Sequence, residues 1–513
     1  MIASKAVLPH TAAPRRTARL FAAGILAFIV ASRWPLAPPY LYYFDSTNFA
    51  LSLDRFNPAL HQPQPPGYAL FVALIRILHL FIRRPEQVLF VAGLLAACAS
   101  AILILVLGRA LFGRTAGLFA MALLASNPVV WFAGITNQVR VFLALAAIAV
   151  ALLAWRAVTR PESPGWLYAA FAALGIGAGF RPEAAVVMAP LLLWAWLRTG
   201  CSLRRLALAV LSLAAAALPW IVVTIQAVGG WRTMIRVLHD YSDAQFSDSS
   251  ALYGARESAA LHMLAEAIVW NGLGVLVWIW AVPAVRRQMP AVLTRLKTEF
   301  LVVWFVPPFL FSAIVHIGAP GHALASIPPL ILVGSAVLAA GVSRWGPRGV
   351  LAAAIAVMAT QTLLFFKPPS RLARAASYKQ ARDVDRLISG TMAAIRAVQA
   401  DGPVTIVHYG SSVSSRQLYY YFPDDYVDIL PRSNKRTDQQ WPTAYYQRKI
   451  LALPAGTGGL IRPGSHKIIC LLPPNAPPDS LPGWHSFGLI FFRELPLNHQ
   501  ITIGPYHLMP VAR

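Results

Sequence analysis

Residues 87–108 read QVLFVAGLLAACASAILILVLG, a run of 22 residues without a charged side chain. A helix of about 20 apolar residues is long enough to cross the hydrocarbon core of a bilayer. The whole chain agrees with this stretch, because 57% of its 513 residues are hydrophobic and only 12% are charged. A soluble domain carries about 25% charged residues. The sequence therefore predicts an integral membrane protein.

Similar apolar runs recur along the chain and predict a polytopic α-helical membrane protein with about 11 transmembrane helices. One further apolar segment, 68–82, is too short to span and contains Arg76 and His79. We expect it to form an amphipathic helix on the membrane surface. The spans are predicted at 17–35, 87–108, 115–133, 138–156, 165–180, 183–198, 206–228, 263–284, 300–317, 323–341 and 349–366.

The basic residues decide the predicted orientation. If 68–82 does not cross the membrane, the segments on the same side of the membrane as the N-terminus hold 17 basic residues and two acidic ones, Glu162 and Glu299. The positive-inside rule then places the N-terminus in the cytoplasm, and an odd number of spans places the tail outside. The net charge of +24 is explained by these topogenic residues and a basic tail. No long basic stripe with interleaved aromatics indicates nucleic-acid binding.

The tail, 367–513, has the composition of a small extracytoplasmic α/β domain that follows a transmembrane domain over 1–366. An amphipathic helix is predicted from Tyr378 to Gln399, and strands at 404–409, 426–430, 467–472 and 487–492. The stretch RQLYYYFPDDY, 416–426, has two interpretations: packing against the membrane domain, or binding of an extended or carbohydrate acceptor. The three cysteines lie far apart, which argues against a cysteine metal centre.

Polar residues gather in the first predicted outward loop, 36–86. Residues 42–68 read YYFDSTNFALSLDRFNPALHQPQPPGY. Asp45 lies among aromatic residues at the membrane face, where partial desolvation makes a carboxylate more basic and suits it to general-base work. A helix is predicted over 46–56, with Asn48 one turn from Asp45. Asp45 can also be read as the N-cap of that helix.

The rest of this loop is stiffened by prolines, which fix φ, while Gly67 permits a turn. It presents His61 and Gln64 beside the acid. The later outward segment, 229–262, is predicted to be a solvated loop, with a mobile lid or an acceptor cleft as the alternative. The sequence has no Walker loop, GxGxxG or HExxH motif, so nucleotide-driven transport and zinc-peptidase chemistry find no support.

At these residues the chain resembles a known family. The pattern FDxxNFAL followed by HxPxPPGY is similar to the first outward loop of GT-C glycosyltransferases. It resembles in particular the bacterial protein O-mannosyltransferase and aminoarabinose transferase group, glycosyltransferase family 39. The resemblance continues in 107–134, in GFRPE at 179–183 and in HIGAPGHALASIPPL at 316–330. Together these motifs cover most of 36–366, and the tail matches only in outline.

The resemblance implies an inverting glycosyltransferase in a bacterial inner membrane. Such enzymes take a sugar from a polyprenyl-phosphate donor at the outer face and transfer it to a hydroxyl of a lipid, glycan or protein acceptor. Asp45 would remove the proton of that hydroxyl. Arginine forks suit the phosphate that leaves. The residues implied in substrate binding are Asn48, His61, Gln64, Tyr68, Arg140, Arg181, His316 and His322.

Each of these residues also has a structural interpretation. Arginines at span ends can snorkel to the interface, and interfacial histidines are usually structural. Many relatives carry a second acid where this chain has Ser46, and some carry one in the turn that reads GITNQVR here. The metal requirement therefore stays unknown, with a divalent cation as one possibility. The alternatives to transfer are a lipid-linked-saccharide transporter or flippase, and a glycan ligase or polymerase.

Overall fold

The computed structural model groups the chain into two compact units. The first comprises the residues up to Ala37, Tyr68–Gln226 and Phe246–Ala381, and the second comprises Pro38–Gly67, Ala227–Gln245 and the residues from Arg382 onward. The predicted domains, 1–366 and 367–513, stay a prediction. The structure describes residues 15–136, 138–246, 250–253, 257–279, 282–286, 288–400, 402–408, 411, 413–423, 425–429, 450–452, 458–461, 464–472, 484–487, 490–494, 501–503 and 506–510.

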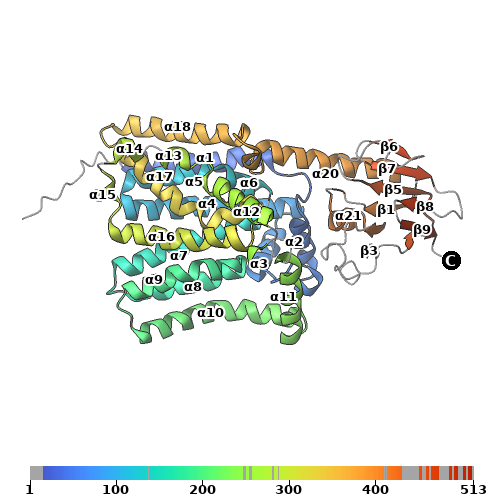
Figure 1. Ribbon diagram of the computed structural model, residues 1–513, viewed down its shortest axis with the longest axis horizontal. Coiled ribbons are helices and arrows are strands. Elements are labelled where there is room, and N and C mark those ends of the chain that lie inside the picture. Colours follow the sequence, from blue (N-terminus) through green and yellow to red (C-terminus); the bar gives the residue numbers. More distant parts are fainter. Residues whose placement is uncertain are drawn as a thin grey trace, which may run out of the picture. The chain divides into compact units, whose positions relative to one another are not determined.

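The first unit is a bundle of apolar helices. Its long helices run roughly parallel to one another (Figure 1), and α4 packs against α1, α5 and α7. Its α-helices are α1 (Arg15–Arg33), α3 (Ala69–His79), α4 (Pro85–Phe112), α5 (Arg114–Ser126), α6 (Pro128–Thr136), α7 (Gln138–Thr159), α8 (Gly165–Phe180), α9 (Glu183–Arg198), α10 (Leu203–Ala227), α12 (Glu257–Gly272), α13 (Leu276–Ile279), α14 (Val282–Val285), α15 (Met289–Val292), α16 (Arg295–Leu310), α17 (Ile327–Gly341), α18 (Pro347–Phe366) and α19 (Arg371–Arg374).

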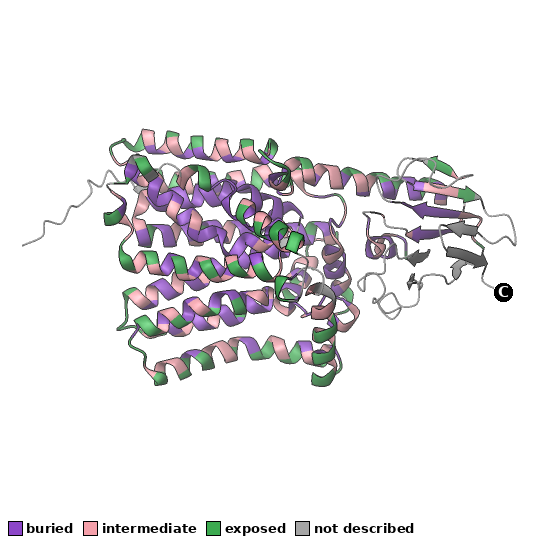
Figure 2. Ribbon diagram, viewed as in Figure 1, coloured by how far each residue is buried: buried purple, intermediate pink, exposed green. Residues whose placement is uncertain are grey.

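The bundle has the character of a multi-pass membrane domain. Among the described residues, six helices are long and apolar enough to cross a membrane, or seven if the bent pair α5 and α6 forms one span. Residues of α4 and α7 are mostly buried, whereas α10 and α18 leave many residues exposed (Figure 2). Those exposed residues include Leu211 and Leu218 of α10 and Leu363 of α18. Large apolar side chains in such positions suit a lipid environment.

Most predicted spans coincide with helices, but some are interrupted. The span at 115–133 bends by 48° between α5 and α6, where Pro128 follows Asn127 and the Asn127 side chain accepts hydrogen bonds from the N–H groups of Val129 and Val130. The prediction of one span at 263–284 is wrong. Helix α12 ends at Gly272, and Gly274 has φ +78°, a left-handed conformation that ends helices.

Short helices lie beside the long ones in this unit. They are η1 (Trp34–Leu36), η3 (Ala251–Tyr253), the π-helical turn η4 (Phe311–Val315) and the 3-10 turn η5 (Pro320–Ala325). The predicted surface helix at 68–82 is confirmed as a helix by α3. At about 1.5 Å per residue its 11 residues are too short to cross a bilayer.

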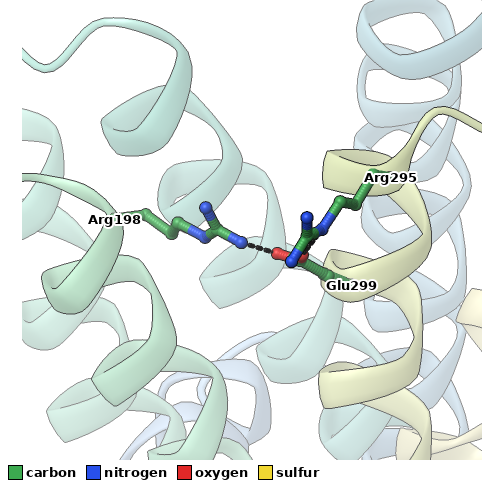
Figure 3. A network of polar contacts seen from close by, with 3 residues as sticks. All are labelled: Arg198, Arg295 and Glu299. Carbon is green, nitrogen blue, oxygen red and sulfur yellow. Dashed lines mark hydrogen bonds and ion pairs between the residues drawn. The ribbon is translucent and has the colours of Figure 1, made fainter.

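An ion-pair network joins two helices of the bundle. Glu299, in the first turns of α16, lies between Arg198 at the end of α9 and Arg295 on its own helix (Figure 3). The Arg295 Nε atom is 3.0 Å from a Glu299 carboxylate oxygen. Arg295 is exposed, so this network stabilises the fold only slightly, but it neutralises part of the charge at these helix ends.

The second unit contains an α/β fold. Its larger sheet has the order β3-β2-β1-β5-β7-β6, in which β1, β2, β3 and β5 are parallel, and the smaller sheet has the order β4-β9-β8. The strands are β1 (Val404–His408), β2 (Tyr426–Ile429), β3 (Ile450–Ala452), β4 (Gly458–Ile461), β5 (Lys467–Leu471), β6 (His485–Phe487), β7 (Ile490–Glu494), β8 (Ile501–Ile503) and β9 (Tyr506–Pro510).

The second unit also contains helices, some of which pack on this sheet. The core combines α20 residues such as Ile395 with Ile406 of β1, Leu418 of α21 and Ile469 of β5. Tyr40, from the first loop, packs against the same core. The helices are α2 (Phe44–Asp54), η2 (Pro58–Leu60), α11 (Trp231–Phe246), α20 (Tyr378–Gln399) and α21 (Ser415–Tyr421).

The predicted small α/β domain is confirmed, with two local corrections. The predicted helix from Tyr378 to Gln399 is α20, with the same bounds. The single strand predicted at 487–492 is wrong, because Phe487 ends β6 and pairs antiparallel with Ile490 at the start of β7. The segment 229–262, expected to be a solvated loop, is helical over Trp231–Phe246, where helix α11 lies.

Candidate functional site

Asp45 lies in the first turn of α2, and Tyr43 is the N-cap of this helix. The N-cap interpretation of Asp45 is therefore wrong, because the helix begins two residues earlier than predicted. A carboxylate in the first turn still gains from the positive end of the helix dipole. Asp45 is half-buried, and the neighbouring Tyr42 is buried. Its assignment as a base stays a prediction.

Helix α2 turns a polar face inward. Asn48, one turn beyond Asp45, is fully buried together with Thr47 and Ser52. Ser46, the neighbour of Asp45, is also buried. A buried amide needs a partner within the protein, and the partner of the Asn48 side chain is an arginine of the tail domain.

Arg416, on α21, is that partner. Its side chain is fully buried. The Nε atom donates to the Asn48 side-chain oxygen at 2.9 Å, and Nη2 donates to the backbone oxygens of Leu60 and His61 at 2.9 and 3.1 Å. One guanidinium thus joins α2 to the turn that follows it. Charge-assisted hydrogen bonds of this kind are stronger than neutral ones.

Further contacts attach the start of the loop to α21. Gln417 donates from Nε2 to the Leu41 oxygen at 2.6 Å, and the Leu41 N–H donates to the Tyr421 hydroxyl at 2.8 Å. The rings of Tyr40 and Tyr421 meet edge to face at 5.2 Å. The aromatic stretch of the tail therefore packs against the first loop, which belongs to the same unit, and its packing against the membrane domain stays a prediction. Acceptor binding by this stretch stays a prediction.

His61 and Gln64 follow in the proline-rich turn and are buried. His61 adopts φ +50°, and its ring lies 6.5 Å from that of Phe44 and 5.8 Å from that of Tyr241 in α11. Burial, followed by the charge of Arg416, lowers the pKa of His61 well below its usual value. A neutral ring is a hydrogen-bonding group rather than a cation at neutral pH.

A second carboxylate, which the sequence did not single out, lies near Tyr42. Asp385 of α20 is buried and accepts a hydrogen bond from Arg382 Nη1 at 2.9 Å. Burial raises the pKa of Asp385 to about 6, although Arg382 opposes the shift. Asp385 also contributes to the raised pKa of Tyr42, whose main cause is burial. Its position on an amphipathic helix of the tail gave no local signal for this environment.

Arg140 lies in the first turn of α7 in the first unit and is 9% exposed. Within the described part of the chain, its Nε and Nη1 atoms are buried without a hydrogen-bond partner. Gly321 of η5 makes room for it, because a Cβ atom there would overlap Cδ of Arg140 and lie 3.0 Å from its Cβ. A buried guanidinium with open donors is suited to an anionic ligand.

Arg181 follows α8, and its side chain is 4% exposed. It forms an ion pair with Glu183, the first residue of α9, and its guanidinium carbon lies 5.3 Å from the centre of the Tyr68 ring. The structure thus brings two predicted site residues, Tyr68 and Arg181, into a cation–π contact. The ion pair leaves Arg181 partly neutralised, in contrast to Arg140.

His316 and His322 flank the turn before α17. Their rings are 4.8 Å apart, and the Gly318 N–H donates to His322 Nδ1 at 3.0 Å. Burial, then the charges of Arg140 and Arg181, lowers the pKa of His316 to about 4. The pKa of His322 is lowered well below its usual value by burial, then by Arg140. These four side chains therefore share one electrostatic environment.

The predicted site residues fall into two groups. Asn48, His61 and Gln64 belong to the second unit with Asp45. The residues of the first unit are Tyr68, Arg140, Arg181, His316 and His322. Their roles stay predictions. The sequence missed Arg416, whose only signal was its place beside an aromatic stretch. Among the residues that the structure describes, no three histidine, cysteine or acidic side chains gather into a metal-binding group.

Comparisons with known proteins give one family match and several similar folds. The family described as dolichyl-phosphate-mannose-protein mannosyltransferase matches residues 63–225. ArnT from Cupriavidus metallidurans in the apo state has a similar fold, with TM-score 0.58, 16% identity and coverage of 89% of this chain and 92% of that one. ArnT from the same organism bound to undecaprenyl phosphate has a similar fold as well. Its TM-score is 0.57 and its sequence identity is 14%, with coverage of 92% of this chain and 97% of that one. No curated protein sequence matches the chain. The resemblance to GT-C glycosyltransferases is confirmed.

Proposed function

We propose that this chain, a multi-pass membrane glycosyltransferase with the GT-C fold, transfers a sugar from a polyprenyl-phosphate donor to an acceptor hydroxyl with inversion. The reaction would take place at the outer face of a bacterial inner membrane, with the N-terminus in the cytoplasm and the tail domain outside. ArnT has been crystallised with undecaprenyl phosphate, which supports a lipid phosphate as the carrier here.

The observation that carries this proposal is the state of Arg140. A buried cation is costly unless it is paired, and two of its nitrogens have no hydrogen-bond partner within the described residues. The phosphate of a polyprenyl donor supplies the missing charge and acceptors. Arg181 and the neutral His316 and His322 add hydrogen-bond donors nearby. These groups would stabilise the negative charge that develops on the phosphate as the glycosidic bond breaks.

The proposed base is Asp45. It would take the proton of the acceptor hydroxyl while the acceptor oxygen forms a bond to the anomeric carbon. The bond from that carbon to the phosphate oxygen breaks, and polyprenyl phosphate leaves with the electron pair. A phosphate leaves without protonation by a strong acid. One carboxylate is therefore sufficient for this chemistry, which accommodates Ser46 in the place of a second acid.

The test compares Asp45→Asn with Asp54→Asn in the purified full-length protein. Both residues lie on α2, but Asp54 is exposed at its end, so its loss is a matched control. With polyprenyl-phosphate sugars and candidate acceptors, Asp45→Asn should lower transfer by about 100-fold or more, as expected for removal of a general base. Asp54→Asn should transfer like the parent. Undiminished transfer by Asp45→Asn would exclude Asp45 as the base.

Phosphate recognition is tested by Arg140→Lys and Arg140→Gln. Lysine keeps the charge but loses the fork of donors. We expect both variants to raise the KM for the donor, with glutamine the more severe. If neither variant changes the KM for the donor, Arg140 does not bind its phosphate.

A further inference from the structure

A second basic site lies at the other end of the helix bundle. A cavity of about 900 Å³ opens between α1, α4, α5 and the end of α7. Five arginines line it: Arg19, Arg109, Arg114, Arg156 and Arg160. They come from all four helices or the residue that follows α7, so the tertiary fold rather than one basic segment gathers them.

The cavity is separate from the cluster around Arg140. Helix α7 carries Arg140 in its first turn and Arg156 in its last turns. Sixteen residues at 1.5 Å per residue place the two backbone positions about 24 Å apart along the helix. The cavity therefore lies most of a bilayer thickness away from the proposed donor phosphate site.

The charge at this cavity is of one sign. Among the described residues that line it, none is an aspartate or a glutamate. Arg156 instead has its guanidinium carbon 6.0 Å from the centre of the Trp166 ring. Elsewhere in the same bundle, the charges of Arg198 and Arg295 are offset by Glu299, which lies between them (Figure 3). This concentration of positive charge attracts an anion.

The lining also has an apolar part. Ala18, Ala22, Leu105 and Val106 border the same cavity, and α1, which supplies two of them, is largely exposed along its apolar length. A free inorganic anion gains nothing from such a surface, whereas acyl chains of an amphiphile do. The first turn of α5, at Arg114, adds the positive end of a helix dipole.

We propose that this cavity binds an anionic glycerophospholipid, with its phosphodiester among the arginines and its acyl chains along α1 and α4. Basic pockets between transmembrane helices are suited to such head groups. A volume of about 900 Å³ accommodates a glycerol phosphodiester and the first part of its chains. The bound lipid holds α1 against the rest of the bundle and joins the ends of α4, α5 and α7.

The test measures lipid retention by native mass spectrometry of the purified full-length protein. The probes are dioleoylphosphatidylglycerol and the zwitterionic dioleoylphosphatidylcholine. The cavity variant is Arg109→Gln with Arg156→Gln. The control is Arg344→Gln with Arg348→Gln. These two exposed arginines lie before α18 and in its first turn, and they do not line the cavity.

We expect the parent and the control to retain phosphatidylglycerol over phosphatidylcholine, and the cavity variant to bind phosphatidylglycerol roughly tenfold more weakly or worse. Equal retention by the cavity variant would overturn the proposal, as would an equal loss in the control, which would indicate only general surface charge. Inorganic phosphate is the second probe, measured by thermal unfolding. If it stabilises the parent as much as the lipid does, the site binds a free anion and the lipid assignment fails.

Discussion

Replacing Arg416 by methionine should detach the loop that carries Asp45 from the tail domain. Methionine keeps much of the side-chain volume but removes the guanidinium. Three acceptors then lose their donor: the Asn48 side-chain oxygen and the backbone oxygens of Leu60 and His61. The contacts to Asn48 and His61 are buried and the contact to Leu60 is partly buried. Water therefore does not replace the lost donor at the first two acceptors without local opening.

The expected loss of folding stability follows from these three contacts. Leaving a buried polar group without its partner costs about 1–3 kcal/mol, so three acceptors set an upper range of several kcal/mol. Methionine also removes the cost of burying a charge, which offsets part of the loss. The net loss of stability is therefore about 2–4 kcal/mol. For a unit of this size that corresponds to a fall of roughly 10 °C in the unfolding temperature.

The assay combines thermal unfolding, limited proteolysis within 38–67 and the rate of sugar transfer. The control is Arg493→Met, an exposed arginine on β7 of the same unit. Arg416→Met should unfold earlier, be cleaved faster in the loop and transfer more slowly, because the carboxylate of Asp45 is no longer held in place. The reasoning is refuted if Arg416→Met behaves like Arg493→Met in unfolding and cleavage.

Three other perturbations test the remaining site residues. Between about pH 4 and 6 the folded protein keeps a proton on Asp385 that the unfolded chain releases, so stability from this group is lost as pH rises through that window. Asp385→Asn should therefore raise the unfolding temperature more at about pH 7.5 than at about pH 4.5. An equal change at both pH values would contradict this reasoning. Gly321→Ala should displace Arg140 and raise the donor KM with circular dichroism unchanged; an unaltered KM would show that Arg140 tolerates the added methyl group. Burial and the charge of Arg140 lower the pKa of His316 and of His322 below the ordinary value of a histidine, so both rings are neutral near pH 6.5. His322→Gln should therefore leave the shape of the KM-against-pH profile unchanged, and a step near pH 6.5 that this variant abolishes would contradict the assignment.

Local sequence was sufficient for much of the fold. The apolar runs predicted most spans because crossing a bilayer requires a continuous apolar helix, which is a property of neighbouring residues. The amphipathic period of α20 predicted both of its ends. The predictions at 263–284 and 487–492 were wrong because each apolar run is interrupted locally. A left-handed Gly274 ends a helix, and a tight antiparallel return divides an apolar run into β6 and β7.

The sequence by itself determined the membrane class, the GT-C resemblance and Asp45 as the residue to test. Only the tertiary structure decided what surrounds each polar side chain. Arg416 meets Asn48 across 368 residues of chain, and a periodic pattern carries no information about such a distant partner. Likewise, Arg140 and His322 were each conspicuous at a helix end, but their shared electrostatic environment depends on how α7 and the turn before α17 pack. Burial and charge act through space, so these properties of the site belong to the fold rather than to any segment of the sequence.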